Sequence, residues 1–476
     1  MSGISTSVPE IFRTLAGACP KERFWLVGGS VRDLLRGRNP VDYDIAVRGN
    51  PGDFAARVAQ VVGGRPAPIG PVEKRIYRVT DGTTVFDCSR LEGDRIEDDL
   101  RRRDFTINAM ALDPVCGMVI DPTDGRKDLH EGLVRMVSAQ VFEHDPVRLA
   151  RAFRIAAVLD LRIEAGTEAL IGQSAALIGR SAGERVRDEL FKILAVKVSE
   201  KTIARMNRCG LLTEIFPEMA ALAGCLQGVH HRYDALTHTL GVLSHLESVL
   251  ADPTKWLPLG GLRALAEEAC SNGVQLKLAA LLHDIGKPAC RKMEGDRTHF
   301  RGHALIGFHM AESIFARLRL SNRDRDLTGF LIRRHIEPLQ LFIAHQRGTL
   351  TRKGRTRFFI RAGELTPPLV LLCLADMAGK KTPADRRFIT FARFADRLLG
   401  DYFDSFRPMR DTPPLVNGKE LMASFALSPS PLLGKILSEI EAERLEGRLN
   451  SKEDAMGRAR ELVLEWQNRD GPPKPK

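Results

Sequence analysis

The hydrophobic positions change their period along the chain. Up to about residue 137, short apolar runs such as residues 24–27 and 43–47 are separated by glycine and aspartate turns, a pattern typical of strands. Residues 75–79 and 83–87 flank Asp81-Gly82, which predicts a hairpin. Beyond residue 137 the apolar positions recur at the helical period almost to the end. The pattern predicts an α+β fold, in which a small α/β head with a mixed sheet precedes an all-helical body.

Length and punctuation divide the chain further. Its 476 residues exceed what one hydrophobic core holds. A long helix is expected from Asp145 to Leu161, and a disordered end after residue 470. The predicted domains are a head at 1–137, a helical neck at 138–225, a histidine-rich helical domain at 226–400 and a helical tail at 401–476.

The formal net charge is +11, from 71 basic and 60 acidic residues, which is compatible with a polyanionic partner. With four tyrosines and three tryptophans, we expect phosphate contacts and shape recognition rather than extensive base stacking. No apolar run reaches about 18 residues, so no membrane span is expected, and residues 1–10 do not resemble a secretory signal. The eight cysteines are scattered, as in reduced cytoplasmic thiols. The sequence gives no indication of the oligomeric state.

The first candidate for chemistry is the carboxylate pair Asp42 and Asp44, in Val-Asp-Tyr-Asp-Ile-Ala-Val. On a strand, residues two apart point to the same face, and two adjacent carboxylates repel unless a cation lies between them. Hard oxygen ligands favour Mg²⁺ or Mn²⁺, which phosphoryl transfer requires. Asp87, on a later strand, would supply a third carboxylate if the strands pair. The alternative is that Asp42 and Asp44 are solvated loop acids.

A glycine turn upstream argues against that alternative. Gly28-Gly29-Ser30 lies between a predicted strand and helix, where exposed backbone N–H groups bind phosphate, and Arg32 adds a fixed cation. Followed by the aspartate pair, this segment resembles the class II tRNA nucleotidyltransferase and bacterial poly(A) polymerase family. Four further motifs extend the resemblance: Arg-Arg-Asp-Phe-Thr-Ile-Asn-Ala at 102–109, Asp-Pro-Thr-Asp-Gly at 121–125, Asp-Pro-Val-Arg at 145–148 and Glu-Arg-Val-Arg-Asp-Glu at 184–189.

The resemblance implies a polymerase-β-like head and a role for each motif. Gly28, Gly29, Ser30 and Arg32 would hold the triphosphate, and Asp42 and Asp44 would bind the metals. Arg103, Asp104 and Asn108 would position the ribose and phosphates of the incoming nucleotide. The later nucleotide contacts would be Asp145, Arg148, Arg151 and Arg154. Without the other motifs, residues 103–108 would be interpreted as a surface helix start with a capping aspartate.

By the resemblance, Asp145 and Arg148 select the base with protein side chains. Cytosine and adenine both present an exocyclic amine beside a ring-nitrogen acceptor, so a carboxylate accepts from the amine and a guanidinium donates to the ring nitrogen. The alternative is that Asp145-Pro146 is an ordinary N-cap with proline at the first helical position. The family has an acidic residue just before this aspartate, where this chain has His144.

A second set of polar residues lies in the helical body, in the order His238, His283, Asp284, His303, His335 and Asp376. An adjacent His-Asp pair supplies two metal ligands, and its carboxylate is able to bridge two ions. The set resembles the HD phosphohydrolase superfamily, including the two histidines of its binuclear members. The resemblance implies a site for a divalent transition metal and a 2′,3′-cyclic phosphodiesterase or phosphatase activity. A lone histidine would more often be a packed or surface residue.

We therefore expect an enzyme that uses Mg²⁺ to add C and A from CTP and ATP to the tRNA 3′ end (CCA addition). The nearest rivals share the chemistry: an A-adding or CC-adding specialist, or a poly(A) polymerase. Residues 89–100 are the candidate for a flexible loop that governs the switch from C to A, which favours A addition. Two other classes stay open: an HD phosphohydrolase with a vestigial head, against which the intact carboxylates argue, and an RNA-binding regulator. The tail would dock the tRNA or only pack the body.

Overall fold

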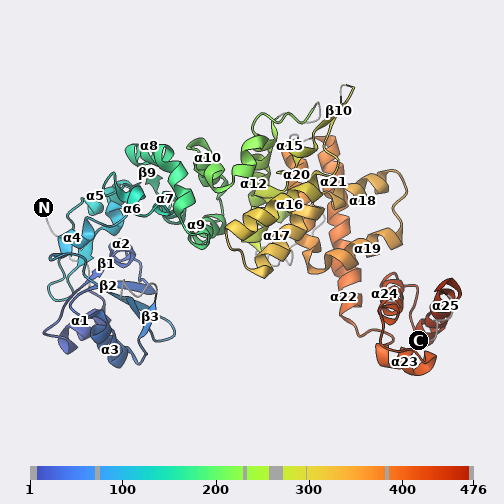
Figure 1. Cartoon of the computed structure of the whole chain (residues 1–476), viewed down its shortest axis with the longest axis horizontal. Helices are drawn as coiled ribbons and strands as arrows, with labels where there is room; N and C mark the ends of the chain where they lie inside the picture. The colour runs from blue at the N-terminus through green and yellow to red at the C-terminus, as the bar shows by residue number, and fades with distance from the viewer. Residues whose placement is uncertain are drawn as a thin grey trace. The chain divides into compact units, whose positions relative to one another are not determined.

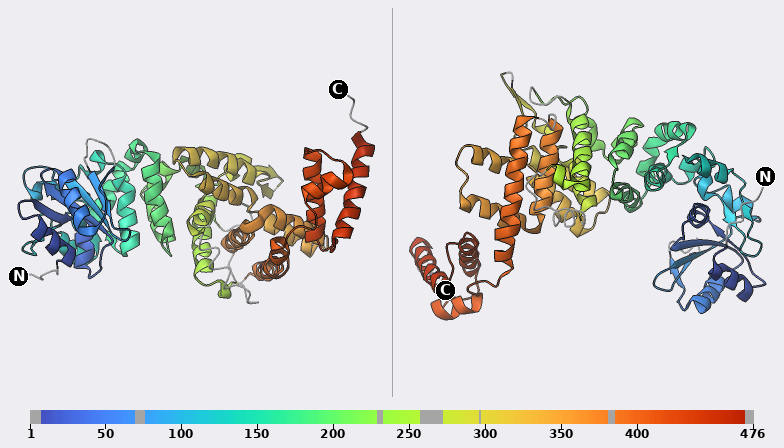
Figure 2. Two further views of the ribbon diagram at one scale, coloured as in Figure 1. Left: turned by 90° about the horizontal axis from the view of Figure 1, so that it is seen from below. Right: turned by 180° about the vertical axis from the view of Figure 1, so that it is seen from behind.

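The computed structural model describes residues 8–69, 76–228, 233–256, 272–295, 297–380 and 385–470. They form two compact units, Met1–Pro217 and Glu218–Lys476 (Figure 1). The first unit contains the seven-stranded sheet and the second is mainly helical, as Figure 2 shows from two further sides. The predicted α+β class is confirmed, whereas the four domain boundaries stay predictions. Arg75 and the predicted disordered end lie outside the described residues.

The sheet is mixed, as predicted. Its strands are β1 (Arg23–Val27), β2 (Asp42–Arg48), β3 (Ala67–Ile69), β4 (Ile76–Thr80), β5 (Val85–Arg90), β6 (Ala111–Leu112) and β7 (Val119–Ile120). Their order is β3-β4-β5-β2-β1-β6-β7. β2 pairs with β5 in parallel and the other neighbours are antiparallel, including the predicted hairpin β4–β5. The parallel pairing sets Asp44 directly opposite Asp87.

The core of the first unit determines which way β2 faces. Tyr43 and Ile45 belong to the hydrophobic cluster that the sheet forms with α1 (Glu10–Ala18) and α3 (Pro51–Val62). The Tyr43 ring lies 4.8 Å from Phe12 and 5.6 Å from Phe86, centroid to centroid. Because side chains alternate along a strand, burying these residues directs Asp42 and Asp44 to the other face.

The rest of the first unit is built from short helices and one small sheet. These are α2 (Gly29–Leu35), α4 (Ile96–Leu100), η2 (Thr106–Asn108), α5 (Gly125–Glu131), β8 (Leu133–Val134), α6 (Val141–His144), α7 (Arg148–Leu159), β9 (Arg162–Ile163), α8 (Ala165–Ser174), η3 (Ala175–Arg180), α9 (Gly183–Ala195), α10 (Glu200–Arg208) and α11 (Leu211–Ile215). β9 pairs with β8 in parallel, so strand structure continues past residue 137, where only helices were expected.

The predicted helix from Asp145 to Leu161 was wrong at both ends, because α7 runs only from Arg148 to Leu159. Asp145 is extended, with φ −150° and ψ 92°. Proline disfavours helical backbone in the residue before it, so Pro146 explains the late start. At the other end, Asp160 takes a left-handed φ of 55°, which stops the helix.

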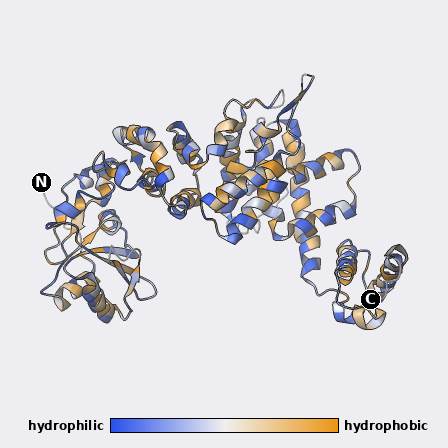
Figure 3. Cartoon of the chain, in the orientation of Figure 1, coloured by the Kyte–Doolittle hydropathy of each residue, from blue (hydrophilic) through white to orange (hydrophobic). Residues whose placement is uncertain are grey.

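In the residues that the structure describes, the second unit is a helical body with a small hairpin. Its elements are η4 (Pro217–Leu222), α12 (Ala235–Ala251), η5 (Pro253–Lys255), α14 (Gly273–Leu282), α15 (Lys287–Cys290), β10 (Lys292–Glu294), β11 (Arg297–His299), α16 (His303–Arg317), α17 (Asn322–Arg334), α18 (Glu337–Gln346), α19 (Arg352–Ala362), η6 (Gly363–Leu365), α20 (Thr366–Lys380), α21 (Arg386–Gly400), η7 (Asp401–Phe406), α22 (Arg407–Asp411), α23 (Gly418–Phe425), α24 (Pro431–Leu445) and α25 (Lys452–Asp470). Most of these helices carry both hydrophilic and hydrophobic residues (Figure 3).

Helix α20 is the centre of this body. Every residue from Thr366 to Ala378 is buried. The continuous helical stretch Arg352–Lys380 has 29 residues and is long and apolar enough to cross a membrane by length and composition, contrary to the expectation that no such run exists. However, 72% of its apolar window is buried inside the structure, which is how a core helix packs.

The tail helices α23, α24 and α25 share a hydrophobic core of their own. Leu421, Ile436 and Ile440 are buried in it, against Ala455 and Ala459 of α25. The tail therefore packs on itself as an amphipathic bundle, and its docking of RNA stays a prediction.

Candidate functional site

The glycine turn joins β1 to α2 and brings two later segments together. Gly28 has a left-handed φ of +74°, which favours glycine. A Cβ added to Gly28 would lie 2.9 Å from Arg103 Nη1 and 3.0 Å from Asp44 Oδ2. The turn, the carboxylate strand and the Arg-Arg-Asp motif therefore meet at one point, where the close side chains and the positive φ favour glycine.

Three carboxylates lie on the two central strands. Asp42 and Asp44 are on β2, and Asp87 is opposite Asp44 on β5. Burial raises the pKa of Asp44 above its ordinary value, and the neighbouring Asp87 and Asp42 raise it further, while Arg103 opposes the shift. Asp42, Asp44 and Asp87 thus bring negative charges together on the two neighbouring strands, and burial of Asp44 adds to the cost of its charge. The site therefore fits a bound cation.

Two arginines are held beside these carboxylates by ion pairs. Arg78 on β4 pairs with Asp87 through two hydrogen bonds, Nε to Oδ1 at 2.8 Å and Nη2 to Oδ2 at 2.7 Å. Arg103 donates from Nε and Nη2 to Asp99 Oδ2, at 3.1 and 3.0 Å. The Asp99 carboxylate is buried and fixes the guanidinium of Arg103 against Gly28 and Asp44.

A chain of hydrogen bonds runs from the glycine turn into the neck. Arg32 Nη1 donates to Asn108 Oδ1 at 2.7 Å, and Asn108 Nδ2 donates to Asp104 Oδ1 at 3.0 Å. Arg151 Nη1 donates to Asp104 Oδ2 at 3.3 Å, and Arg151 Nε donates to Glu189 Oε1 at 2.8 Å. Residues of three of the five motifs are thus connected, through Arg151 of α7, in a continuous polar network.

The buried Asp104 carboxylate of this network is charged. Burial opposes ionisation of Asp104, but Arg151, the Asn108 amide and the Phe105 N–H outweigh it and hold the pKa of Asp104 below its ordinary value. Glu189 is buried and also pairs with Arg154, Nε to Oε2 at 2.5 Å. Asp104 is 8% exposed, so the alternative of a surface helix start with a capping aspartate is wrong.

The Asp-Pro-Val-Arg motif lies where α7 begins. Asp145 accepts two hydrogen bonds from Arg185 of α9, at 2.9 and 2.8 Å, and its Oδ2 lies 3.8 Å from Arg148 Nε. The N-cap of α7 is Val147, and no side chain caps the helix, so the capping alternative for Asp145 is wrong. Ser30 is buried and its hydroxyl donates to Val27 O at 2.8 Å, which leaves Gly28, Gly29 and Arg32 at the turn itself.

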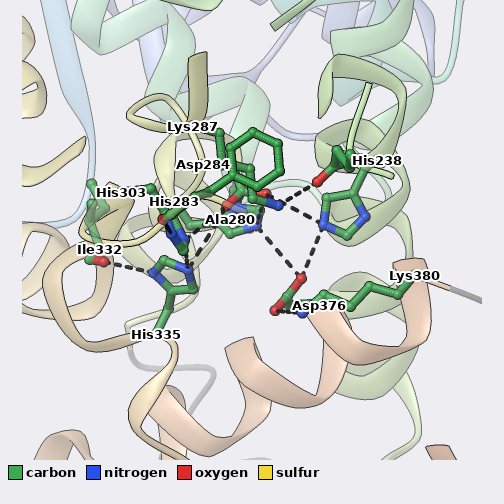
Figure 4. A network of polar contacts seen from close by, with 12 residues as sticks. His238, Ala280, His283, Asp284, Lys287, His303, Ile332, His335, Asp376 and Lys380 are labelled. Atoms are coloured by element: carbon green, nitrogen blue, oxygen red, sulfur yellow. Dashed lines mark hydrogen bonds and ion pairs between the residues drawn. The ribbon is translucent and has the colours of Figure 1, made fainter. Parts of the chain in front are cut away.

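The six predicted residues of the helical body converge on one buried point (Figure 4). His238, His283 and Asp284 form one group of ligand atoms, and Asp284, His303 and His335 form a second, each group within 4.8 Å. Asp284 belongs to both: its Oδ2 lies 3.1 Å from His283 Nε2, and its Oδ1 lies 3.4 Å from His303 Nε2. Asp376 Oδ1 lies 3.0 Å from His238 Nε2.

Backbone carbonyls orient three of these rings. The Nδ1 atoms of His283, His303 and His335 each lie 2.8 Å from the carbonyl oxygen three residues earlier. If each Nδ1–H donates there, each neutral ring presents the lone pair of its Nε2 to the centre. His303 Nε2 and His335 Nε2 are 3.1 Å apart, where two lone pairs would repel unless a cation lies between them. The donor set therefore fits a metal ion.

Burial lowers the pKa of His238, His303 and His335, which agrees with that fit, whereas Asp284 and Asp376 outweigh burial and raise the pKa of His283. Burial, with the neighbouring His283 and His303, lowers the pKa of His335 to about 3, so this ring is neutral at neutral pH. Burial opposes the charge of Asp284, yet His283 and Lys287 hold its pKa well below the ordinary value. Neutral imidazoles around an ionised carboxylate are the forms that bind metals.

Three family models match the chain. They are described as "Poly A polymerase head domain" (residues 24–135), "Probable RNA and SrmB- binding site of polymerase A" (160–222) and "HD domain" (235–377). The A-adding tRNA nucleotidyltransferase of Deinococcus radiodurans is 34% identical over 450 residues, covering 93% of this chain and 95% of that protein. The CC-adding tRNA nucleotidyltransferase of Thermus thermophilus is 32% identical over 456 residues, 94% of each.

The chain belongs to the tRNA nucleotidyltransferase family. A solved structure described as "Thermotoga maritima CCA-adding enzyme complexed with tRNA_CCA" shares the fold, with a TM-score of 0.61, 21% identity and 97% coverage of both chains. The family resemblance seen in the sequence is therefore confirmed, and so are the nucleotidyltransferase head and the HD domain. Membership also implies dependence on divalent metal, since both domains use it.

Within this tRNA nucleotidyltransferase, the sequence patterns missed the residues that support the predicted ones. They are Arg78 and Asp99 in the first unit, and Gln227, Lys287 and Lys380 in the second. Arg185 and Glu189 lie in the motif at 184–189, but the sequence did not indicate which residues they pair with. The spacing of the two lysines could have predicted their ion pairs, because Lys287 and Lys380 follow Asp284 and Asp376 by three and four residues. The ion pair of Arg78 could also have been predicted, because Arg78 lies opposite Asp87 in the predicted hairpin.

Gly286 allows the HD helices of this tRNA nucleotidyltransferase to approach closely. A Cβ at Gly286 would lie 2.3 Å from His303 O and 2.5 Å from Gly307 N. Gly286→Ala is therefore expected to lower the free energy of unfolding by about 1–3 kcal/mol, the usual cost of overpacking. Urea unfolding measures it. Gly241→Ala in α12, with nothing within 4 Å, is the control and should stabilise slightly; equal shifts in both variants would contradict the steric explanation.

Proposed function

We propose that this chain completes the 3′-terminal CCA of tRNA, using CTP and ATP. The observation that carries the proposal is the meeting of Gly28, Arg103 and Asp44 at one point, with Asp42 on the same strand face. Relatives of nearly equal identity are named A-adding and CC-adding, and a third, 32% identical over 334 residues, is the "Multifunctional CCA protein" of Legionella pneumophila. Both kinds of nucleotide addition thus occur among proteins similar to this one.

In the proposed reaction, the tRNA 3′-hydroxyl attacks the α-phosphate of the bound nucleotide and pyrophosphate leaves. Asp42 and Asp44 would hold Mg²⁺, which when bound activates the hydroxyl and offsets the triphosphate charge. Asp87 lies opposite Asp44 and is oriented by Arg78. The turn at Gly28 and Gly29 would hold the triphosphate.

The arginine network would position the nucleotide. Arg32 is fixed by Asn108 and Arg103 by Asp99, so both guanidinium groups are oriented before a triphosphate arrives. Asp104 accepts hydrogen bonds from Asn108 and from Arg151. The triphosphate contacts would thus be connected to α7, the helix where bases would be selected.

Base selection would rest on Asp145 and Arg148. The carboxylate accepts from the exocyclic amine of cytosine or adenine, and the guanidinium donates to the adjacent ring nitrogen. Uracil and guanine present the reverse order, leaving each group unpaired at a cost of about 1–3 kcal/mol. Because the protein has a net charge of +11, it would hold the RNA substrate mainly by contacts to phosphates. The reaction would take place in the cytoplasm.

The test offers purified protein three tRNA transcripts, ending at the discriminator base, after one C and after two Cs. Each nucleotide is supplied separately with Mg²⁺, and products are separated on a gel. We expect CTP incorporation on the first two and ATP incorporation on the third. Activity on only the first two, or only on the third, would assign a CC-adding or an A-adding specialist. Long adenosine tails on any RNA would identify a poly(A) polymerase.

A second activity is supported by the two ligand groups that share Asp284. We infer that the HD domain, loaded with a divalent transition metal, hydrolyses phosphate esters such as 2′,3′-cyclic nucleotides or RNA 3′-end phosphates. The metal-loaded protein should release product in excess of a His283→Ala variant prepared in parallel. Equal rates in the two preparations would remove this activity from the proposal.

A further inference from the structure

Asp145, a candidate for base selection, lies between α6 and α7 and belongs to neither helix. Its backbone is extended, because it precedes Pro146, and α7 starts three residues later at Arg148. Its carboxylate caps nothing. A side chain in such a position has rotamer freedom unless a partner from elsewhere in the fold restrains it.

Arg185, on the neighbouring helix α9, supplies that restraint. Its Nη1 donates to Asp145 Oδ1 at 2.9 Å and its Nη2 to Asp145 Oδ2 at 2.8 Å. Two parallel hydrogen bonds between planar groups fix the plane of the carboxylate as well as its place. Asp145 is only half-buried, so without this pair its orientation would be set by water.

The pairing leaves Asp145 able to accept another hydrogen bond. A carboxylate has about four lone-pair sites, and Arg185 uses one on each oxygen. Arg148 Nε lies 3.8 Å from Asp145 Oδ2 and is buried without a hydrogen-bond partner. A fixed acceptor thus lies beside a donor without a hydrogen-bond partner, the two kinds of group that the amine and ring nitrogen of cytosine or adenine would meet.

The residue before Asp145 does not orient its carboxylate as Arg185 does. Where the family has an acidic residue, this chain has His144, which is exposed at the end of α6. Arg148 has one other contact, from Nη1 to Arg102 O at 3.4 Å. The orientation of the base-selecting pair therefore depends on α9 more than on the chain next to it.

We propose that Arg185 is a positioning residue for base selection, which fixes the Asp145 carboxylate in the plane that accepts the amine of cytosine or adenine. This inference rests on the proposed function of Asp145 and Arg148. It assigns to Arg185 discrimination between bases rather than catalysis of the transfer, since Arg185 reaches the nucleotide only through Asp145.

The experiment measures kcat/KM for correct and incorrect nucleotides. CTP and UTP are compared on tRNA that ends at the discriminator base, and ATP and GTP on tRNA that ends in two Cs. Arg185→Gln should reduce the preference for C over U and for A over G by roughly 10- to 100-fold, the effect of one misplaced hydrogen bond. Arg185→Lys, which keeps the charge but not the paired geometry, should restore part of it.

Lys192→Gln is the matched control, because Lys192 is exposed on the same helix and the change removes the same charge. It should leave both preferences unchanged. Arg185 is 47% exposed, so its replacement is compatible with folding, which circular dichroism checks. If Arg185→Gln behaves like Lys192→Gln, or binds CTP more tightly than the unaltered protein, the inference is overturned.

A double-mutant cycle tests whether Arg185 acts through Asp145. In an Asp145→Asn background, Arg185→Gln should cause no further loss of preference; independent, additive losses would overturn the inference. The unaltered protein distinguishes failure of the proposed function from failure of the role of Arg185. If it incorporates neither C nor A, the proposed function fails, whereas if it does and the variants keep its preferences, only the role of Arg185 fails.

Discussion

Asp44→Asn is expected to reduce nucleotide addition by about 10³-fold while the head stays folded. Asparagine keeps the size of the side chain but removes the charge. A bound metal stabilises the developing charge by several kcal/mol, and each 1.4 kcal/mol or so changes the rate about tenfold. The neutral side chain should not strain the strand, since burial and two neighbouring carboxylates already raise the pKa of Asp44. Single-turnover addition of CTP to tRNA, with Mg²⁺ varied, measures the loss.

Asp53→Asn is the matched control for that variant, because Asp53 is an exposed aspartate in the first turn of α3, in the same unit. Its addition rate should stay within a factor of about two, as most surface substitutions change little. Urea unfolding of both variants separates a lost metal ligand from a lost fold. An Asp44→Asn protein that keeps the full rate would show that this carboxylate is not part of the reaction.

The sequence was sufficient where chemistry follows from local periodicity. The alternation in β2 predicted that Asp42 and Asp44 share a face, and burial of Tyr43 and Ile45 confirms it. The third carboxylate depended on the pairing of strands far apart in sequence. No local signal specifies that β5 joins β2 in parallel, because the two strands between them in sequence order, β3 and β4, form the edge of the sheet instead.

The buried ion pairs were beyond local reasoning. Asp104, Arg151 and Glu189 are spread over more than 80 residues, and nothing in the sequence around them indicates that they pair. Only tertiary packing buries them together, where pairing offsets the cost of removing charge from water. The short strands β9, β10 and β11 were missed for a different reason, since two or three residues are too few to display alternation.

The HD ligands were predicted from their order, and the structure adds how they are oriented. His283 and His335 both end a helix, where their Nδ1 reaches the carbonyl three residues earlier. Helix ends have unpaired carbonyl groups, so this position both satisfies a carbonyl and turns the ring inward. The sequence before His283 is apolar, whereas the sequence before His335 is rich in charged residues, so no common local pattern marks the two positions.

Asp284→Ala is expected to remove bound metal from the HD domain without affecting nucleotide addition. Asp284 belongs to both ligand groups, so its loss disrupts each of them. The affinity should fall by more than the roughly 10- to 100-fold that loss of a supporting hydrogen-bond partner causes. The metal content of the purified protein after dialysis, measured by elemental analysis, reports the change.

The control is Asp326→Asn, an exposed aspartate of α17, which should keep its metal. Asp284→Ala also leaves Lys287 without the carboxylate that it pairs with, so some loss of thermal stability is expected. That loss should be partly relieved by Lys287→Met in the same chain, whereas the metal should stay absent. Retention of metal by Asp284→Ala would contradict a shared bridging ligand. Because none of the residues that position the nucleotide belongs to this cluster, a parallel loss of CTP addition would show that the two metal sites depend on each other.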